Sequence, residues 1–211
     1  MSLPDTNTLL LFMTAALALN VTPGPDMLYV VARSVGEGRA AGVISSFGIA
    51  AGSLVHTMAV ALGLAGLLRA VPIAFEIVKW AGAAYLIWLG VRALRARQSA
   101  TEHVSVLPAS RWAIFGQGML TNVLNPKVAL FFLAFLPQFV DPERGPVALQ
   151  IISLGLLFNT SGTIVNVLVA FLASGAGSWS RRRFGESSVL RRVTGVLFIG
   201  LGVRLAFLER G

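Results

Sequence analysis

The sequence contains no cysteine and only two histidines, His56 and His103, among its 211 residues. Without thiols the chain has no disulfides, no thiolate-bound metals and no iron–sulfur clusters, and two separate histidines do not supply a histidine-rich metal site. Charge is scarce as well, because 12% of the residues are charged, against about a quarter in an ordinary soluble domain. The composition argues against metal-dependent and cysteine-dependent enzymes, and we expect no metal and no cofactor.

Hydrophobic residues make up 55% of the chain, and the mean hydropathy is +0.77. The net charge of +8 could suggest nucleic acid as a partner, but a nucleic-acid protein should show a soluble basic face. Here the basic residues lie in short stretches between apolar spans, as in the cytoplasmic loops of membrane proteins. Residues 1–8 carry no Lys or Arg, so we interpret the apolar stretch after them as a membrane helix rather than a cleavable signal peptide.

Apolar spans long enough to cross a bilayer recur along the chain. A helix needs about 20 apolar residues to cross the hydrocarbon core, and the stretch 40–68 contains no Asp, Glu, Lys or Arg. The sequence predicts an all-α integral membrane protein of six transmembrane helices, at about 8–33, 40–68, 72–94, 112–140, 147–173 and 193–208.

Helix-breaking residues interrupt the first and fourth of these spans near their middle. The first span contains Thr22-Pro23-Gly24-Pro25, and the fourth contains Asn125-Pro126. Because proline lacks an amide donor and clashes with the preceding turn, both helices should kink or unwind there. A matched pair of broken helices in the two halves of a membrane protein is the best sequence indication of a transporter's substrate site.

The dipeptide Asn-Val precedes each break, at 20–21 and at 122–123, an offset of 102 residues. We interpret this match as an internal duplication, with a first three-helix repeat at 1–95, a polar cytoplasmic linker at 96–110 and a second three-helix repeat at 111–211. An odd number of helices in each repeat places the second repeat upside down relative to the first. Inverted repeats of this kind are the arrangement that many alternating-access transporters use.

Loop charges predict the orientation of the helices. Eleven arginines lie in or beside the loops after the first, third and fifth helices, and four lie near the opposite side. By the positive-inside rule, the three basic loops lie in the cytoplasm and both termini lie outside. The eleven are Arg33, Arg39, Arg92, Arg95, Arg97, Arg111, Arg181, Arg182, Arg183, Arg191 and Arg192, and the four are Arg69, Arg144, Arg204 and Arg210.

The first break should expose polar backbone groups. Carbonyls one turn before it lose their partners and could coordinate a cation or a substrate ammonium group. The half-helix that starts near Asp26 presents free N–H groups and a positive dipole end, which suits a carboxylate. Asn122, Asn125 and Pro126 should form the equivalent feature in the fourth span, so two opposed helix ends could hold both charges of a zwitterionic amino acid. The alternative is a structural kink in which the Asn side chains compensate the broken backbone.

Asp26 and Lys127 lie a few residues past the two breaks. Charges at this depth cost about 2.5–3.5 kcal/mol each on insertion scales and are functional candidates by default. Our hypothesis is that both face one cavity and pair during part of a transport cycle, with Asp26 as a proton carrier. The alternative is an unchanging ion pair that only holds the two halves together.

Other polar or small residues have two interpretations each. Asn159 and Asn166 share one face of the fifth predicted helix, where they could line the cavity or bond another helix. His56 could gate or shuttle protons, or it could bond a neighbouring helix. Gly48 and Gly52 form a small-xxx-small pair that lets helices approach closely. The faces of small residues are compatible with a homo-oligomer, but the sequence does not determine the oligomeric state.

Three motifs together resemble the LysE/RhtB family of bacterial amino-acid exporters. The first is Thr22-Pro23-Gly24-Pro25-Asp26, and the second is Gly82-Ala83-Ala84-Tyr85-Leu86 followed by Leu89-Gly90. The third runs from Leu124 through Asn125-Pro126-Lys127 to Phe132 and continues to Leu136-Pro137-Gln138-Phe139. Their order and spacing match across almost the whole length.

The resemblance implies a multi-pass efflux protein of the bacterial inner membrane. Family members export amino acids or derivatives such as homoserine, homoserine lactone, threonine, leucine or lysine, and are thought to use the proton gradient. The sequence has no Walker-type phosphate-binding loop, which fits secondary transport. The site residues that the resemblance carries over are Thr22, Pro23, Gly24, Pro25, Asp26, Asn125, Pro126 and Lys127.

The runner-up function is the export of a divalent cation, since related families in the wider superfamily carry metal ions. A pathway for a hard metal would need several buried carboxylates, yet Asp26 is the one acid deep in a predicted span. An enzymatic function is the third alternative. A hydrolase needs a nucleophile with a base, or a metal with its ligands, and a sequence with no cysteine and two separate histidines offers little of either. The expected partner is therefore a small amino-acid substrate in a protein embedded in lipid.

Overall fold

The computed structural model describes residues 4–70 and 108–186, together with scattered positions between 80 and 95 and between 192 and 203. Most of the predicted third and sixth helices, 72–94 and 193–208, therefore lies outside the described residues. The helices are α1 (Thr6–Val21), α2 (Pro25–Glu37), α3 (Arg39–Ala70), α5 (Arg111–Val123), α6 (Pro126–Leu130), the π-helix η1 (Phe131–Phe135), the 3-10 helices η2 (Leu136–Phe139) and η3 (Pro142–Arg144), and α7 (Val147–Glu186).

The described part of the chain is helical and contains no strand, which confirms the all-α prediction. Two stretches are long and apolar enough to cross a membrane, Arg39–Gly63 in α3 and Val147–Gly175 in α7. Two bent pairs, α1 with α2 and α5 with α6 to η2, bring the number of candidate spans to four when each pair counts as one. The prediction of six spans in two inverted repeats stays a prediction.

Both predicted helix breaks are present. Each pair bends by 48° at its break, and the second helix of each pair begins with a proline, Pro25 in α2 and Pro126 in α6. Proline suits the first helical position, because the amide that it lacks has no helical partner there. The Asn125 side chain caps the start of α6 by accepting the Lys127 backbone N–H at 3.0 Å.

The predicted end of the fifth helix is wrong. We expected a helix at about 147–173 followed by a basic loop, but α7 continues to Glu186 and contains Arg181, Arg182 and Arg183. Hydropathy predicts where a helix leaves the hydrocarbon core, and the apolar part of α7 does end at Gly175. It does not predict where the helix itself ends, because arginine is a good helix former.

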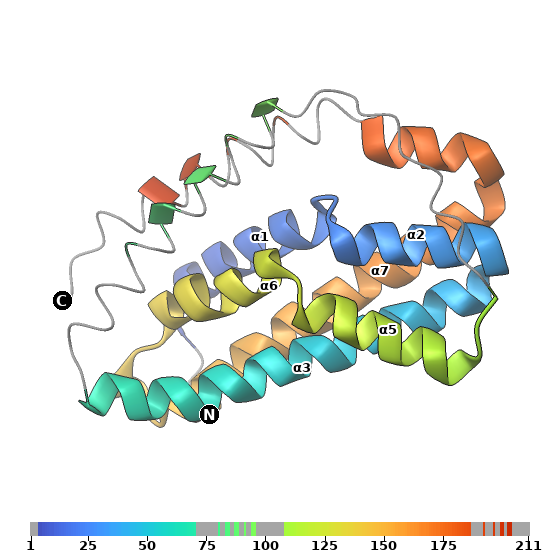
Figure 1. Ribbon diagram of the computed structural model, residues 1–211. Coiled ribbons are helices and arrows are strands. Elements are labelled where there is room, and N and C mark those ends of the chain that lie inside the picture. Colours follow the sequence, from blue (N-terminus) through green and yellow to red (C-terminus); the bar gives the residue numbers. More distant parts are fainter. Residues whose placement is uncertain are drawn as a thin grey trace.

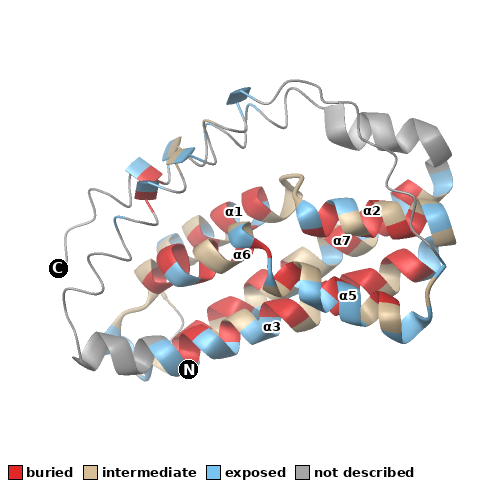
Figure 2. Cartoon of the chain, in the orientation of Figure 1, coloured by how far each residue is buried: buried red, intermediate tan, exposed pale blue. Residues whose placement is uncertain are grey.

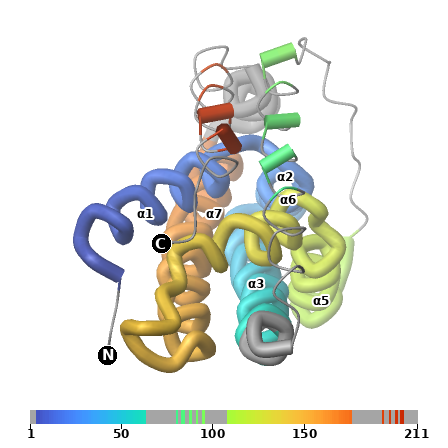
Figure 3. The backbone as a smooth tube through the Cα atoms, turned by 90° about the vertical axis from the view of Figure 1, so that its left-hand side faces the viewer, coloured from blue at the N-terminus to red at the C-terminus, as the bar shows by residue number. Residues whose placement is uncertain are grey.

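The two breaks lie side by side (Figure 1). On one side of the breaks α1 lies near α6, and on the other side α2 lies near α5, while the long α3 and α7 run past both. Figure 3 shows α3, α5 and α6 grouped on one side of α7 and α1 on the other. At Gly38, φ is +86°, a left-handed conformation that glycine tolerates, so α2 ends and α3 begins within one residue.

Small residues bring α3 and α5 into backbone contact. A Cβ built on Gly48 would lie 2.2 Å from the Phe115 carbonyl oxygen, and one on Gly52 would lie 2.7 Å from that of Met119. Any larger residue would push the helices apart, so the predicted packing role of this glycine pair is confirmed.

Buried residues occur along all the labelled helices (Figure 2), and their hydrophobic members form two clusters. One, called here the aromatic cluster, joins α1, η1, η2 and α7 and contains Phe12, Phe131, Phe132, Phe135, Phe139 and Phe158. The other joins α2, α3 and α7 around Met27, Val30, Ile49, Val169 and Ala170. The two breaks lie between these clusters.

Candidate functional site

A pocket lies where the two breaks meet. Its walls come from the end of α1, the start of α2, the end of α5, the start of α6, and the facing turns of α3 and α7. The empty space measures about 430 Å³ when the part that opens outward is counted, but water molecules have only about 30 Å³ for their centres. That is room for roughly two waters, so a larger ligand requires the pocket to widen.

Lys127 reaches from α6 across to the first break. Its Nζ donates hydrogen bonds to the carbonyl oxygens of Leu19, at 3.1 Å, and Thr22, at 2.9 Å. The helical partner of the Leu19 carbonyl would be the backbone N–H of residue 23, which proline lacks. The Leu19 carbonyl, one of those that we expected to attract a cation, and the Thr22 carbonyl are therefore bound by an ammonium group of the protein itself.

Gly24 makes room for this side chain. A Cβ on Gly24 would lie 3.1 Å from Lys127 Nζ and 3.3 Å from its Cε, closer than most real contacts. The φ of Gly24 is −162°, an extended conformation open to any residue. The reason for glycine here is thus the space that the lysine needs rather than the backbone conformation.

Asp26 lies in the first turn of α2 and is 9% exposed. Its Oδ2 accepts a hydrogen bond from Asn122 Nδ2 at 2.8 Å. Its Oδ1 is buried without a hydrogen-bond partner in the described part of the chain. A carboxylate at the start of a helix interacts favourably with the helix dipole, and the free oxygen leaves capacity to bind a donor.

Asp26 and Lys127 line the same pocket, as the sequence predicted. In the contacts of the described residues, however, Lys127 bonds two carbonyls and Asp26 bonds Asn122. Direct pairing of the two charges during a transport cycle therefore stays a hypothesis.

His56 contacts the second break from α3. Its Nε2 lies 3.1 Å from the carbonyl oxygen of Asn122, and its ring stacks on Phe132 with centroids 5.8 Å apart. Asn122 is the penultimate residue of α5, and its carbonyl oxygen also accepts the backbone N–H of Asn125 at 2.9 Å. Of the two interpretations of His56, the structure shows the bond to a neighbouring helix.

Helix α7 supplies the polar wall opposite the two charges. Asn159 and Asn166 both line the pocket, and Thr163 lies between them on the same face. Asn20 in α1 donates hydrogen bonds to Ser161 Oγ, at 3.0 Å, and to the Phe158 carbonyl, at 3.4 Å. These contacts attach the last turn of α1 to the middle of α7.

Half of the predicted site residues line the pocket and half build the backbone around it. The pocket-lining ones are Thr22, Asp26, Asn122, Lys127 and Asn159, and the others are Pro23, Gly24, Pro25, Asn125 and Pro126.

Sequence reasoning missed four polar or small positions in the pocket wall, Asn20, Ser53, Gly162 and Thr163. The repeated Asn-Val pair could have indicated Asn20, and Thr163 shares the helical face of Asn159. Nothing in the sequence distinguishes Ser53 or Gly162 from other small residues of membrane helices.

The pocket walls are electrically balanced. Asp26 is the acidic residue and Lys127 the basic one among the residues that line it, and the others are neutral. Amide and hydroxyl groups come from α1, α3, α5 and α7, and Met27, Val128 and Phe158 contribute apolar surface. Such a mixture suits a small molecule that carries one positive charge, one negative charge and a short side chain.

Comparisons with known proteins place the sequence among membrane transport proteins. The sequence matches the family model described as LysE type translocator over residues 17–209. It is 32% identical over 195 residues to the homoserine/homoserine lactone efflux protein of Salmonella typhimurium, covering 92% of this chain and 94% of the other. It is 30% identical over 210 residues to the leucine efflux protein of Salmonella choleraesuis, covering 94% of each.

A membrane protein of Pseudomonas aeruginosa without an assigned function is 34% identical over 189 residues, covering 87% of this chain and 88% of the other. No solved structure matches the chain significantly.

Proposed function

Since the chain belongs to the family of LysE type translocators, we propose that it is a secondary transporter that exports amino acids or close derivatives across a bacterial inner membrane. The observation that carries the proposal is the meeting of two broken helices around one carboxylate and one ammonium group, Asp26 and Lys127. Matched relatives are named for the efflux of homoserine, homoserine lactone and leucine. Both the family and these relatives are transport proteins rather than enzymes.

The charges of the pocket suggest how a zwitterion binds. A substrate ammonium group takes the place of Lys127 Nζ at the carbonyls of Leu19 and Thr22, or binds the free Oδ1 of Asp26. Lys127, once displaced, is available to the substrate carboxylate. In the empty pocket the two carbonyls bind Lys127 and Asn122 binds Asp26, so substrate and lysine exchange places without leaving a buried ammonium group unpaired.

Asp26 is the proposed site of proton coupling. A carboxyl that bonds an amide in the empty pocket and a substrate ammonium in the loaded one can accept a proton when the substrate leaves. The proton enters from the outside, protonates Asp26 after export, and is released to the cytoplasm before the next substrate binds. Lys127 takes part by returning to its carbonyls in the empty state.

The proposed topology is the one that the loop charges predict, with six helices, two inverted three-helix repeats and both termini outside. The adjacency of the two breaks (Figure 1) supports it, because equivalent broken helices of inverted repeats meet at the repeat interface. Under this topology, α2 and α5 are the cytoplasmic halves of their spans, and α1 and α6 are the outer halves.

A divalent metal cation fits the pocket less well than an amino acid. Hard cations take six or more oxygen ligands with several carboxylates, whereas Asp26 is the one acid among the described pocket residues and Lys127 repels a cation. The matched relatives also give no support to metal export.

Proteoliposomes preloaded with a panel of amino acids, with an imposed pH gradient, test the proposal. We expect efflux of neutral amino acids that accelerates when the outside is acidic. Asp26→Asn should retain exchange of labelled for unlabelled substrate but lose the response to the gradient. Asp141→Asn is the matched control, because Asp141 is a half-exposed acid at the start of η3 and should behave as wild type.

Absence of exchange for every amino acid would refute amino-acid export. A wild-type rate with unchanged pH dependence in Asp26→Asn would remove Asp26 from the coupling role.

A further inference from the structure

One face of α2 is polar along its whole length. Asp26, Tyr29, Arg33 and Glu37 are spaced by three, four and four residues, so they form a single stripe on the helix. The first lies in the pocket, and the last ends the helix. Arg33, in the middle, is 3% exposed.

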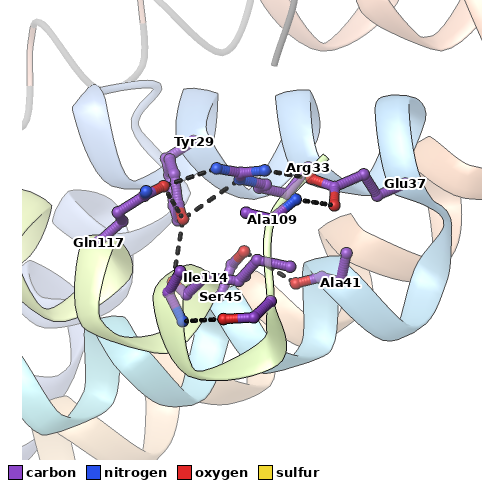
Figure 4. A network of polar contacts seen from close by, with 10 residues as sticks. Tyr29, Arg33, Glu37, Ala41, Ser45, Ala109, Ile114 and Gln117 are labelled. Atoms are coloured by element: carbon purple, nitrogen blue, oxygen red, sulfur yellow. Dashed lines mark hydrogen bonds and ion pairs between the residues drawn. The ribbon is translucent and has the colours of Figure 1, made fainter. Parts of the chain in front are cut away.

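This stripe faces α5, and Tyr29, Arg33 and Glu37 bond to α5 or to the residues just before it (Figure 4). Tyr29 OH donates to the Ile114 carbonyl at 2.9 Å, and an Arg33 NH2 group donates to Gln117 Oε1 at 2.6 Å. Arg33 also forms an ion pair with Glu37, and the other oxygen of that carboxylate accepts the backbone N–H of Ala109 at 3.0 Å.

At the pocket end of the stripe, Asp26 accepts a hydrogen bond from Asn122 of α5. We call this row of residues, Asp26, Tyr29, Arg33 and Glu37 of α2 with Gln117 and Asn122 of α5, the polar seam. From Asp26 to Glu37 it rises eleven residues, or about 16 Å at 1.5 Å per residue. That is roughly half of the 30 Å hydrocarbon core, so the seam extends from the pocket to one membrane surface.

Helix contacts in membranes are ordinarily made by small residues, as α3 and α5 show at Gly48 and Gly52. Charged side chains at membrane depth instead tend to face water-filled cavities and mark translocation pathways. A row of hydroxyl, guanidinium, carboxylate and amide groups gives a zwitterion polar partners at every step between water and the pocket. An apolar contact of the same length would offer it none.

We propose that the polar seam between α2 and α5 is the route by which substrate reaches the pocket from the cytoplasm, and that Arg33 is the gate that closes it. The identity of the substrate that follows this route rests on the proposed function, but the separation of α2 from α5 does not. When α2 and α5 separate, the bonds of Arg33 and Tyr29 to α5 break and the seam fills with water. The Arg33–Glu37 ion pair lies within α2, so the guanidinium keeps its counter-charge in the open state.

The absence of cysteine allows a single introduced thiol to report access to the pocket. Ser53 lines the pocket, is 3% exposed, and has no hydrogen-bond partner for its hydroxyl among the described residues. Ser53→Cys therefore adds a thiol of similar size at the bottom of the proposed route. Labelling of this thiol by a small membrane-impermeant methanethiosulfonate is measured in vesicles of both orientations.

Gln117→Leu, made in the Ser53→Cys background, is the gate variant, because it removes the α5 side-chain acceptor shown for Arg33 and leaves no cavity at an exposed position. We expect labelling of the introduced thiol from the cytoplasmic face to accelerate about tenfold, while labelling from the outer face does not rise. The matched control is Gln138→Leu, since the Gln138 amide bonds the Ala134 carbonyl within its own helical segment in the outer half. It should leave cytoplasmic labelling unchanged.

Gln117→Glu provides a test of opposite sign. A carboxylate in place of the amide strengthens the bond to Arg33, and cytoplasmic labelling should slow. Equal acceleration from both faces in Gln117→Leu would show loosened packing and overturn the proposal, as would unchanged labelling in both Gln117 variants. Labelling needs no substrate, so the route can stand if amino-acid export fails, and export can stand if the route fails.

Discussion

The two halves of this molecule, on either side of the helix breaks, are held together by different chemistry. Between α2 and α5 the contacts are hydrogen bonds of the polar seam. Between α1 and the α6–η2 segment the contacts are the rings of the aromatic cluster, with centroids 5.3 Å apart for Phe12 and Phe139 and 6.0 Å for Phe12 and Phe131. Water or a zwitterion can replace the hydrogen-bond partners of the first set, but not the packed rings of the second.

The difference suggests a division of labour. Hydrogen bonds in a seam can be exchanged for bonds to water at little net cost, so a polar half can open repeatedly. Packed aromatic rings lose dispersion contacts that neither water nor a zwitterion replaces. We therefore expect changes in the polar half to alter transport with modest effects on stability, and changes in the aromatic half to do the reverse.

The largest effect is expected at Lys127, where the two halves meet. Lys127→Met removes the donor of the Leu19 and Thr22 carbonyls and leaves Asp26 without a nearby cation. Efflux from proteoliposomes should fall by about 100-fold or more, as for the removal of one partner of a buried charge pair. The size-exclusion profile of the purified protein controls for folding, and retention of more than a third of the wild-type rate would contradict the assigned role.

A substitution in the aromatic cluster should act on stability. Phe132 is 0% exposed, so Phe132→Ala should lower the free energy of unfolding by about 3–5 kcal/mol. Thermal unfolding in detergent measures the change. The neighbouring Leu133 is 52% exposed, and Leu133→Ala is the matched control with a much smaller expected shift. If both substitutions lower the melting temperature equally, the aromatic cluster is not what stabilises this half of the molecule.

Gly24→Ala should separate transport from stability within the pocket. The added methyl displaces the head of Lys127 by a few tenths of an ångström or more, and misplacement of a binding group by about 1 Å can cost up to about 100-fold in rate. We expect efflux to fall about tenfold with little change in melting temperature. Gly116→Ala in α5 is the control, because a Cβ there has open space and should leave efflux unchanged.

The smallest effect is expected at the N-terminal end of α1. Asp5 accepts hydrogen bonds from the backbone and side chain of Thr8, and these bonds lower the pKa of Asp5 from its usual 3.8. A lowered pKa means that the stabilisation is present above about pH 3.8 and is lost as the pH falls through the pKa of the folded state.

The melting temperature should therefore decline slightly below about pH 4 in wild type, and less so in Asp5→Asn, whose amide can still cap α1. Because Asp5 is exposed, the difference should be small. A steeper decline in the variant than in wild type would contradict this account of the cap.

Local chemistry explains what could be predicted. Proline inside a helical span breaks or kinks the helix. Both breaks therefore follow from the presence of Pro23, Pro25 and Pro126 in the sequence. The stretch predicted at 40–68 is α3, Arg39–Ala70, because continuous apolar character leaves no local signal to end it. The predicted end of α7 was wrong for the converse reason, because a change from apolar to polar residues does not by itself end a helix.

The pocket was predicted in outline because charges at membrane depth are rare enough to indicate function. Its internal bonding was not predictable. Whether Lys127 bonds Asp26 or the Leu19 and Thr22 carbonyls depends on side-chain distances between α1, α2 and α6. The spacing of Asp26, Tyr29, Arg33 and Glu37 in the sequence places them on one face of a helix. The sequence does not show which helix that face contacts, so no function could be inferred from it.

The amino-acid sequence alone therefore determined four features: the all-α fold class, the membrane environment, the two helix breaks and the two charged residues of the pocket. Each of these depends on the properties of residues close together in the sequence. Only the tertiary structure decided that the breaks adjoin, that Lys127 occupies the carbonyls of the other half, and that α2 faces α5 through polar groups while α1 faces η2 through aromatic ones. These facts depend on distances between segments about a hundred residues apart, and no local property of the chain specifies them.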